Sequence, residues 1–349
     1  MRSGGGLGSL GAIGSIVKQS VVAKSIAPIV HTNRQNVTPI YTYSWSQQSG
    51  APSQRYATFI IDDIGNTAIT TSITNISGTQ GPFVTIDRGA TWTRKATGMA
   101  FPPGAATLAC CLARSKPSVM YASVESAGYL YKSTNGGDSW TELTSAGLRD
   151  WRSIYCDSVG SNIVATAWNS YIHRSTDGGS NWTVLSNSGQ YINWDQTFIS
   201  DDGRTIAGAI SGLNIAVSTN GGSNFTLNSS FGNYFWRGLS GSSDGRVLFA
   251  GHLNGAALSK DSGATWVDIT SSIGGTGTCS NTAVSADGSK LATAKNNGNI
   301  YVSQDGGTTW VTQTSAGTST WEGIGINATG TTIIAGPSNA GRPWVGSGS

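Results

Sequence analysis

The sequence predicts an all-β protein, a single domain of repeated four-stranded antiparallel units, and three observations lead to this prediction. A turn-like octapeptide recurs six times at nearly constant spacing. Charged residues make up only 11% of the 349 residues, whereas there are 48 glycines. Hydrophobic residues make up 38% of the chain and include 12 tryptophans, which is enough for a large core. This profile is typical of short strands joined by tight turns, and it excludes a disordered chain, which lacks aromatic residues.

The octapeptide follows the pattern Ser/Thr-x-Asp/Asn-x-Gly-x-Ser/Thr/Asn-Trp/Phe, and its copies start at Thr85, Ser133, Ser175, Ser218, Ser259 and Ser303. The Asp or Asn side chain can accept hydrogen bonds from turn amides. The glycine suits a positive φ, and the aromatic residue buries a large apolar surface. We therefore expect a structural role for Asp87, Trp92, Asn135, Trp140, Asp177, Trp182, Asn220, Phe225, Asp261, Trp266, Asp305 and Trp310.

A second turn precedes most copies of the octapeptide, for example at Asp202-Gly203 and Asp244-Gly245, and apolar strands flank it. Each period therefore contains four short antiparallel strands, which is the size of one propeller blade. Six periods carry the octapeptide, and a seventh begins at Trp321 and lacks it. The sequence predicts a single seven-bladed β-propeller over residues 37–349, closed by residues 37–48 as the outer strand of the last blade.

The six copies resemble the BNR or Asp-box repeats of sialidases, which also occur in sortilin-type receptors, xyloglucan-active glycosidases and photosystem II assembly factors. The resemblance covers residues 40–349 and implies the propeller fold. It also implies that each box lies between the third and fourth strands of a blade, away from the usual ligand face. Because these families differ in function, the resemblance does not transfer an activity.

A sialidase would also carry three arginines that grip a carboxylate, a Tyr–Glu pair, an Asp acid and a Phe/Tyr-Arg-Ile-Pro motif. That motif is absent, and the chain has only the glutamates Glu125, Glu142 and Glu322. A retaining glycosidase needs two carboxyl groups about 5 Å apart, and no convincing pair can be chosen from the sequence. We therefore expect no catalytic residues and no enzymatic activity.

One face of the predicted propeller carries the loops that lead into each blade. Tryptophans recur at the ends of four of these loops, and arginines stand at or beside the starts of three inner strands. Aromatic rings beside arginines suit a sugar or a protein partner, although a repeated tryptophan also suits packing between blades. The candidate ligand-binding residues are Arg55, Trp151, Arg152, Trp194, Trp236, Arg237 and Trp321.

No cofactor or metal site is expected. The cysteines Cys110, Cys111, Cys156 and Cys279 have no paired spacing and fit buried apolar positions, and the three histidines are scattered. No apolar stretch reaches the roughly 18 residues that a transmembrane helix needs.

Residues 1–36 lie outside the repeat and form a Gly-rich, apolar N-terminal arm. The first 50 residues carry four basic side chains and no acid, which is too sparse a charge for nucleic-acid binding. Such an arm cannot build its own core, so we expect it to pack against other protein subunits. The alternatives are a targeting peptide and a disordered leader.

The function expected from these features is non-catalytic binding and assembly. The favoured setting is a virion, where the chain would be a surface, decoration or fibre-associated protein of a phage or virus, anchored by residues 1–36. Its loop face would bind a glycan or a protein receptor. The alternatives are a chaperone similar to photosystem II assembly factors, a glycoside hydrolase, and a secreted or lumenal location.

Overall fold

The structure is a computed structural model that describes residues 42–72, 80–102, 105–189, 192–228, 233–339 and 341–348. The chain divides into two units, Met1–Val37 and Thr38–Ser349, and every described residue belongs to the second. The predicted arm at residues 1–36 therefore lies outside the described residues. No helix in the described part of the chain is long and apolar enough to cross a membrane.

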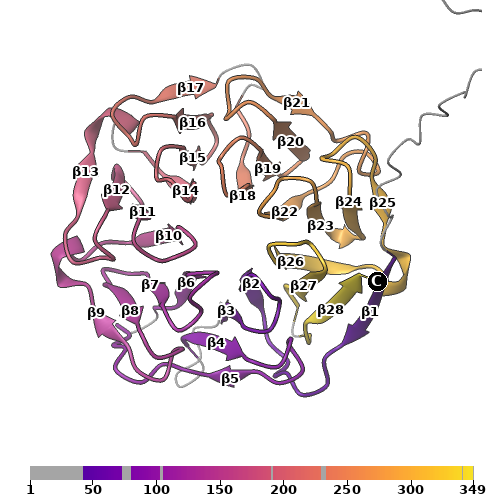
Figure 1. The fold of residues 1–349 in the computed structure, drawn as a ribbon, viewed down its shortest axis with the longest axis horizontal. Coiled ribbons are helices and arrows are strands. Elements are labelled where there is room, and N and C mark those ends of the chain that lie inside the picture. Colours follow the sequence, from indigo (N-terminus) through magenta and orange to yellow (C-terminus); the bar gives the residue numbers. More distant parts are fainter. Residues whose placement is uncertain are drawn as a thin grey trace, which may run out of the picture. The chain divides into compact units, whose positions relative to one another are not determined.

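Five four-stranded antiparallel sheets stand around a common axis, and in each the chain runs from the innermost strand outward (Figure 1). The innermost strand of each sheet is named first in this list: β2 (Tyr56–Ile61), β3 (Ala68–Ser72), β4 (Pro82–Thr85), β5 (Thr93–Arg94); β6 (Thr107–Leu112), β7 (Met120–Val124), β8 (Leu130–Ser133), β9 (Thr141–Glu142); β10 (Trp151–Cys156), β11 (Ile163–Ala167), β12 (Ile172–Ser175), β13 (Thr183–Leu185); β14 (Trp194–Ile199), β15 (Ile206–Ile210), β16 (Ile215–Ser218), β17 (Thr226–Asn228); β18 (Trp236–Gly241), β19 (Leu248–His252), β20 (Gly255–Ser259), β21 (Val267–Asp268).

The remaining strands form one eight-stranded sheet instead of two further blades. Its order is β1 (Tyr43–Gln47), β28 (Trp344–Gly348), β27 (Thr332–Pro337), β26 (Ser319–Ile326), β23 (Leu291–Gly298), β24 (Ile300–Ser303) and β25 (Val311–Thr312), and β22 (Cys279–Val284) also pairs with β23. Short 3-10 helices follow three outer strands, namely η1 (Thr144–Ala146), η2 (Ser186–Ser188) and η3 (Thr314–Ala316).

The predicted seven-bladed, closed propeller is therefore wrong: the structure has five four-stranded blades and a curled eight-stranded sheet. The cause lies in β23 and β26, which are each eight residues long. β23 extends beyond Lys295, the last residue that it pairs with β22, and this extension includes Asn297, where φ is 55°. Its extra residues pair with the start of β26, through Asn296 with Thr320 and Gly298 with Ser319. This pairing merges the two units into one sheet.

The first described strand lies on the last one. β1 pairs antiparallel with β28 over five residue pairs, from Tyr43 opposite Gly348 to Gln47 opposite Trp344. Tyr43 is buried and its hydroxyl donates a hydrogen bond to the carbonyl of Gly330. This strand gives β28 a partner on its outer edge, which would otherwise present unpaired backbone groups.

The core lies between neighbouring sheets and close to the axis. Every residue of β3, β7, β11, β15 and β19 is buried, so burial along these second strands is continuous and does not alternate between residues. Strands covered on both faces show this pattern. The two-residue outer strands β5 and β21 are exposed and present only short edges at the rim.

The octapeptide forms the turn between the third and fourth strands of its sheet, as in the copy that starts at Ser175. The Ser175 hydroxyl donates to Asp177 Oδ1 at 2.9 Å and accepts from Gly179 N at 2.9 Å. Asp177 accepts two hydrogen bonds from Asn181, at 2.9 and 2.7 Å, and these bonds lower the pKa of Asp177 to about 2. The Trp182 indole donates to Gly179 O at 3.0 Å. The turn therefore satisfies its own polar groups.

The glycine of this turn is required twice over. In the copy that starts at Ser218, Gly222 has a φ of 89°, a conformation that residues with a Cβ rarely adopt. A Cβ there would also lie 2.5 Å from Leu185 Cδ1 of the preceding sheet. The octapeptide turn thus packs against the preceding sheet, in addition to forming hydrogen bonds within itself.

A second set of turns follows the innermost strands and joins the sheets around the axis. Each turn is hydrogen-bonded to the next: Asp63 N to Arg114 O (3.0 Å), Ser115 N to Ser158 O (2.9 Å), Ser158 N to Asp201 Oδ1 (2.8 Å), Asp201 N to Ser243 O (2.8 Å), Ser243 N to Ala286 O (2.9 Å), Ala286 N to Ala328 O (2.9 Å) and Asn327 Nδ2 to Asp63 O (3.4 Å). These bonds fix the distances between the inner strands and so the width of the axial space.

Candidate functional site

Each innermost strand has a β-bulge or similar irregularity near its start. In β10, for example, Trp151 and Ser153 pair with successive residues of β11, so Arg152 has no partner in the ladder. The residues skipped at this point are Ala57 and Thr58 in β2, Leu108 and Ala109 in β6, Arg152 in β10, Asp195 in β14, Arg237 in β18, Ser280 in β22 and Glu322 in β26. Bulges re-aim side chains, and they are common beside binding sites.

The skipped residues surround one cavity of about 490 Å³. We call it the mouth cavity, because it lies at the end of the axial space where the inner strands begin. Among the skipped residues only Ala109 is not part of its wall, and the other lining residues are Arg55, Gln196, Trp236, Leu253, Thr278, Asn281 and Asn296. The wall is mainly polar, with charges of both signs.

The structure brings the three predicted arginines, Arg55, Arg152 and Arg237, to this one cavity. Arg55 is engaged by Glu322 through two hydrogen bonds of 2.7 Å each, from its Nε and from one terminal nitrogen. The bonds to Glu322 raise the pKa of Arg55. Both carboxylate oxygens of Glu322 are thus committed to a fixed, bidentate pair.

Arg152 is also held by its neighbours. Its guanidinium bonds to Asp150 at 3.1 Å, lies 3.8 Å from Glu125, and stacks 3.5 Å from the ring centre of Trp168. Its Nε is buried and has no hydrogen-bond partner in the described part of the chain. Burial raises the pKa of Glu125, and Arg152 offsets part of this rise.

Arg237 differs from the other two. It is exposed, and no carboxylate within the described ranges lies within ion-pair distance of it. Asp195 lines the same cavity, and burial raises its pKa while Ser211 and Arg237 act in the opposite direction. Arg237 is therefore the cation of the mouth cavity that is available to a ligand.

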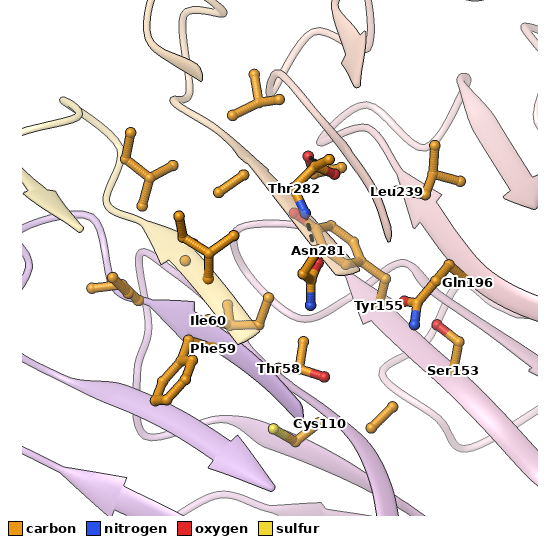
Figure 2. Close-up of a pocket in the computed structure, with 18 of the residues that line it drawn as sticks. Thr58, Phe59, Ile60, Cys110, Ser153, Tyr155, Gln196, Leu239, Asn281 and Thr282 are labelled. Carbon is orange, nitrogen blue, oxygen red and sulfur yellow. Dashed lines mark hydrogen bonds between the residues drawn. The ribbon is translucent and has the colours of Figure 1, made fainter. Parts of the chain in front are cut away.

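The axial space narrows below the mouth cavity. Figure 2 shows Thr58, Ser153, Gln196 and Asn281 converging on it from separate strands, and its free volume is about 50 Å³. The Asn281 amide donates across to Ala57 O at 3.2 Å. Only small molecules such as water fit here, so a larger ligand is confined to the mouth.

Arg114 occupies the far end of the axial space. It follows β6, yet its guanidinium reaches Ser243, which follows β18, at 2.7 Å and Asp201 at 3.7 Å. The side chain of Arg114 is about 10% exposed. Its contacts brace strands on separate sheets and reduce access from this end.

The four predicted tryptophans are buried rather than displayed. Trp151, Trp194, Trp236 and Trp321 are at most 2% exposed. Their indoles pack within and between sheets, and Trp236 Nε1 donates to Leu213 O at 2.9 Å. Contact between these rings and a ligand stays a prediction, because only Trp236 forms part of the cavity wall.

Sequence reasoning missed Asp195 and Glu322, although a signal was present. Each directly follows one of the recurring tryptophans, in the same position as Arg152 and Arg237. The tryptophan fills the space between sheets and the next residue bulges into the cavity. A recurrent Trp followed by a charged residue was therefore the signature of the site.

Exposed apolar side chains accompany the mouth cavity on one side. Leu148, Trp168, Leu213 and Phe235 are 56%, 44%, 41% and 55% exposed, and all lie in loops at the end where the inner strands begin. We call these four residues the apolar crescent. None of these four residues is among the ligand-binding residues predicted from the sequence.

No group of His, Cys, Asp and Glu within the described ranges could hold a metal ion. The four cysteines are free and buried, and burial raises the pKa of Cys279 to about 11. Burial also raises the pKa of the Cys110 and Cys111 thiols, so these three thiols are protonated at neutral pH.

Comparison with known proteins places the fold but not a family. No protein-family model matches the chain, and no curated protein sequence matches it. Solved structures that this chain resembles include β-propellers of 10–17% identity, and likeness at that level of identity concerns the fold alone.

Three of these structures illustrate the range of functions. The xyloglucanase of Xanthomonas campestris has a TM-score of 0.65 and 14% identity over 87% of this chain and 53% of its own, so this chain spans about half of that enzyme. YCF48 bound to a D1 peptide has a TM-score of 0.64 and 15% identity over 88% of this chain and 95% of its own. The propeller domain of Swd1 from Myceliophteria thermophila has a TM-score of 0.65 and 10% identity over 87% of this chain and 99% of its own.

Proposed function

We propose that the chain is a non-catalytic binding propeller that holds a segment of a protein partner at its mouth cavity. The observation that carries the proposal is the unpaired, exposed Arg237 beside the apolar crescent. A charged anchor next to exposed apolar side chains is the usual composition of a protein-recognition surface. The structure of YCF48 with a D1 peptide supports it, because a chain of similar fold and length holds a peptide.

Three features argue against a hydrolase. Glu322 is held by Arg55 through both oxygens, so neither oxygen is free to act on a substrate. A sialidase grips its substrate carboxylate with three arginines. Here Arg152 is engaged by Asp150, so Arg237 has no such set of free arginines beside it. Asp195 is the one carboxyl of the cavity wall whose pKa is raised, and an acid–base mechanism needs a second group with a complementary role.

The setting that we propose is a virion or another particle, with residues 1–36 contacting other protein subunits. This part of the proposal rests on the sequence alone, namely the apolar arm and the low charge of the body. A second candidate is a chaperone similar to photosystem II assembly factors, in a lumenal or secreted setting, and the likeness to YCF48 favours it. Binding of a glycan on the loop face is the alternative to a protein partner.

The test combines a random dodecapeptide library displayed on phage, panned against the full chain, with a glycan array probed by the same protein. We expect selected peptides that protect the starts of β10, β14 and β18 in hydrogen exchange. The proposal would be overturned by protection of the octapeptide turns instead, by binding to glycans alone, or by hydrolysis of a glycan.

A further inference from the structure

The mouth face is asymmetric. Every residue of the apolar crescent belongs to loops of three consecutive sheets, those of β10–β13, β14–β17 and β18–β21. The opposite sector, around β26 and β2, carries the Arg55–Glu322 pair, and no large apolar side chain of its described residues is strongly exposed on this face. A partner therefore meets apolar surface on one side of the axis and a neutralised ion pair on the other.

The loops of the apolar crescent are joined to one another by hydrogen bonds. Asn193 accepts from Asn169 N at 3.4 Å and from Ser211 N at 2.8 Å, which ties the loop of Trp168 to the loop of Leu213. Tyr234 N then donates to Leu213 O at 3.2 Å and extends the connection to the loop of Phe235. The surface is thus preformed, which lowers the entropy lost on binding.

Charges of both signs lie beside this surface, because Asp195 at the start of β14 lines the same wall and interacts electrostatically with Arg237. Arg237 is exposed and unpaired within the described ranges, whereas Arg152 is held by Asp150 and Trp168. Arg237 also follows Phe235 by two residues, so the cation and the apolar crescent meet at the start of β18.

We propose that the partner segment docks off the axis, over the sheets of β10, β14 and β18, and that it carries an acidic group and adjacent large apolar side chains. The acidic group accepts hydrogen bonds from Arg237, and the apolar side chains cover Phe235, Leu213 and Trp168. This inference rests on the proposed function and adds to it the chemistry and the direction of the bound segment.

A protein segment fits this surface better than a sugar or a lipid. Leu148 and Leu213 are aliphatic and offer no ring for a sugar to stack on, and one side of the Trp168 ring faces Arg152 at 3.5 Å, which leaves Phe235 as the one other ring of the apolar crescent. A lipid surface needs several free cations, whereas Arg237 is the single unpaired arginine of this cavity wall.

The test uses the dodecapeptides selected on the full chain, synthesised with a fluorescent label. We expect an Asp or Glu close to Leu, Ile, Phe or Trp in the selected sequences. Arg237→Gln should weaken binding by at least about tenfold, because a hydrogen bond to a charged group is lost. Leu213→Ser and Phe235→Ser should each weaken binding of the same peptides. An Asp→Asn or Glu→Gln change in the peptide should weaken binding to the unaltered protein but should not weaken binding to the Arg237→Gln protein further.

Arg88→Gln is the matched control, because Arg88 is an exposed arginine in an octapeptide turn at the opposite end of its sheet. Unchanged binding in this variant is expected, and an equal loss would show that the effect is general electrostatics. If the peptides lost affinity for the Glu322→Gln protein but kept their affinity for the Leu213→Ser and Phe235→Ser proteins, the off-axis orientation would be overturned and the proposed function would stand. Failure to select any peptide would overturn both.

Discussion

Strand β1 pairs with β28, and the substitution Tyr43→Ala tests how much this pairing contributes to the stability of the fold. Tyr43 is 4% exposed, and its ring packs in the cluster that contains Trp321 and Ile333. Removing a large buried aromatic side chain costs about 3–5 kcal/mol of unfolding free energy. Tyr43→Phe keeps the ring and removes the hydrogen bond to Gly330 O, which should cost about 1 kcal/mol.

The assay is equilibrium unfolding in guanidinium chloride followed by circular dichroism, which does not depend on the tryptophan signal. Ser46→Ala is the control, because Ser46 is an exposed residue of the same strand and its loss should change stability by less than about 0.5 kcal/mol. If Tyr43→Ala also stayed within that limit, β1 would contribute little, and the stabilising role given to this strand would have to be abandoned.

Three further predictions concern the turns, pH and chemistry. Trp140→Ala should cost about 3–5 kcal/mol because Trp140 is 4% exposed, and Trp310→Ala should cost less because its ring stays partly exposed; equal losses in chemical denaturation would contradict this order. Burial beside Trp151 lowers the pKa of His173 to about 4, so protonation of His173 favours the unfolded chain. The contribution of the neutral ring to the free energy of unfolding is fully present above pH 6.5, and it should fall by up to about 3 kcal/mol as the pH is lowered to 4. His173→Gln should flatten this pH dependence, and an unchanged slope would assign it elsewhere. Finally, no hydrolysis of sialosides or β-glucans is expected, and turnover that disappears in Arg152→Ala or Arg237→Ala would refute the non-catalytic assignment.

The local structure could be predicted from the sequence because it depends on nearby residues. The octapeptide contains the hydroxyl, the carboxylate or amide, the glycine and the aromatic ring that its turn uses, so Ser175 and Asp177 find their partners within six residues. The four-stranded order of five sheets followed from the same repeat. The sequence also shows Arg55, Arg152 and Arg237 at or beside the starts of inner strands, and in the structure all three line the mouth cavity.

The tertiary structure decided what depends on distant residues. Partners that are distant in the sequence decide whether an arginine is free or neutralised. Arg55 is paired with Glu322, 267 residues away, whereas Arg237 is exposed and has no such partner in the described part of the chain. The fusion of the last two units came from two extended strands that meet only in space, through Asn296 and Thr320. The sequence by itself determined the repeated unit, because the hydrogen bonds of its turn join residues close together in the chain. Only the tertiary structure determined which arginines of the mouth cavity are paired with a carboxylate, because ion pairing depends on distance in space and not on separation along the chain.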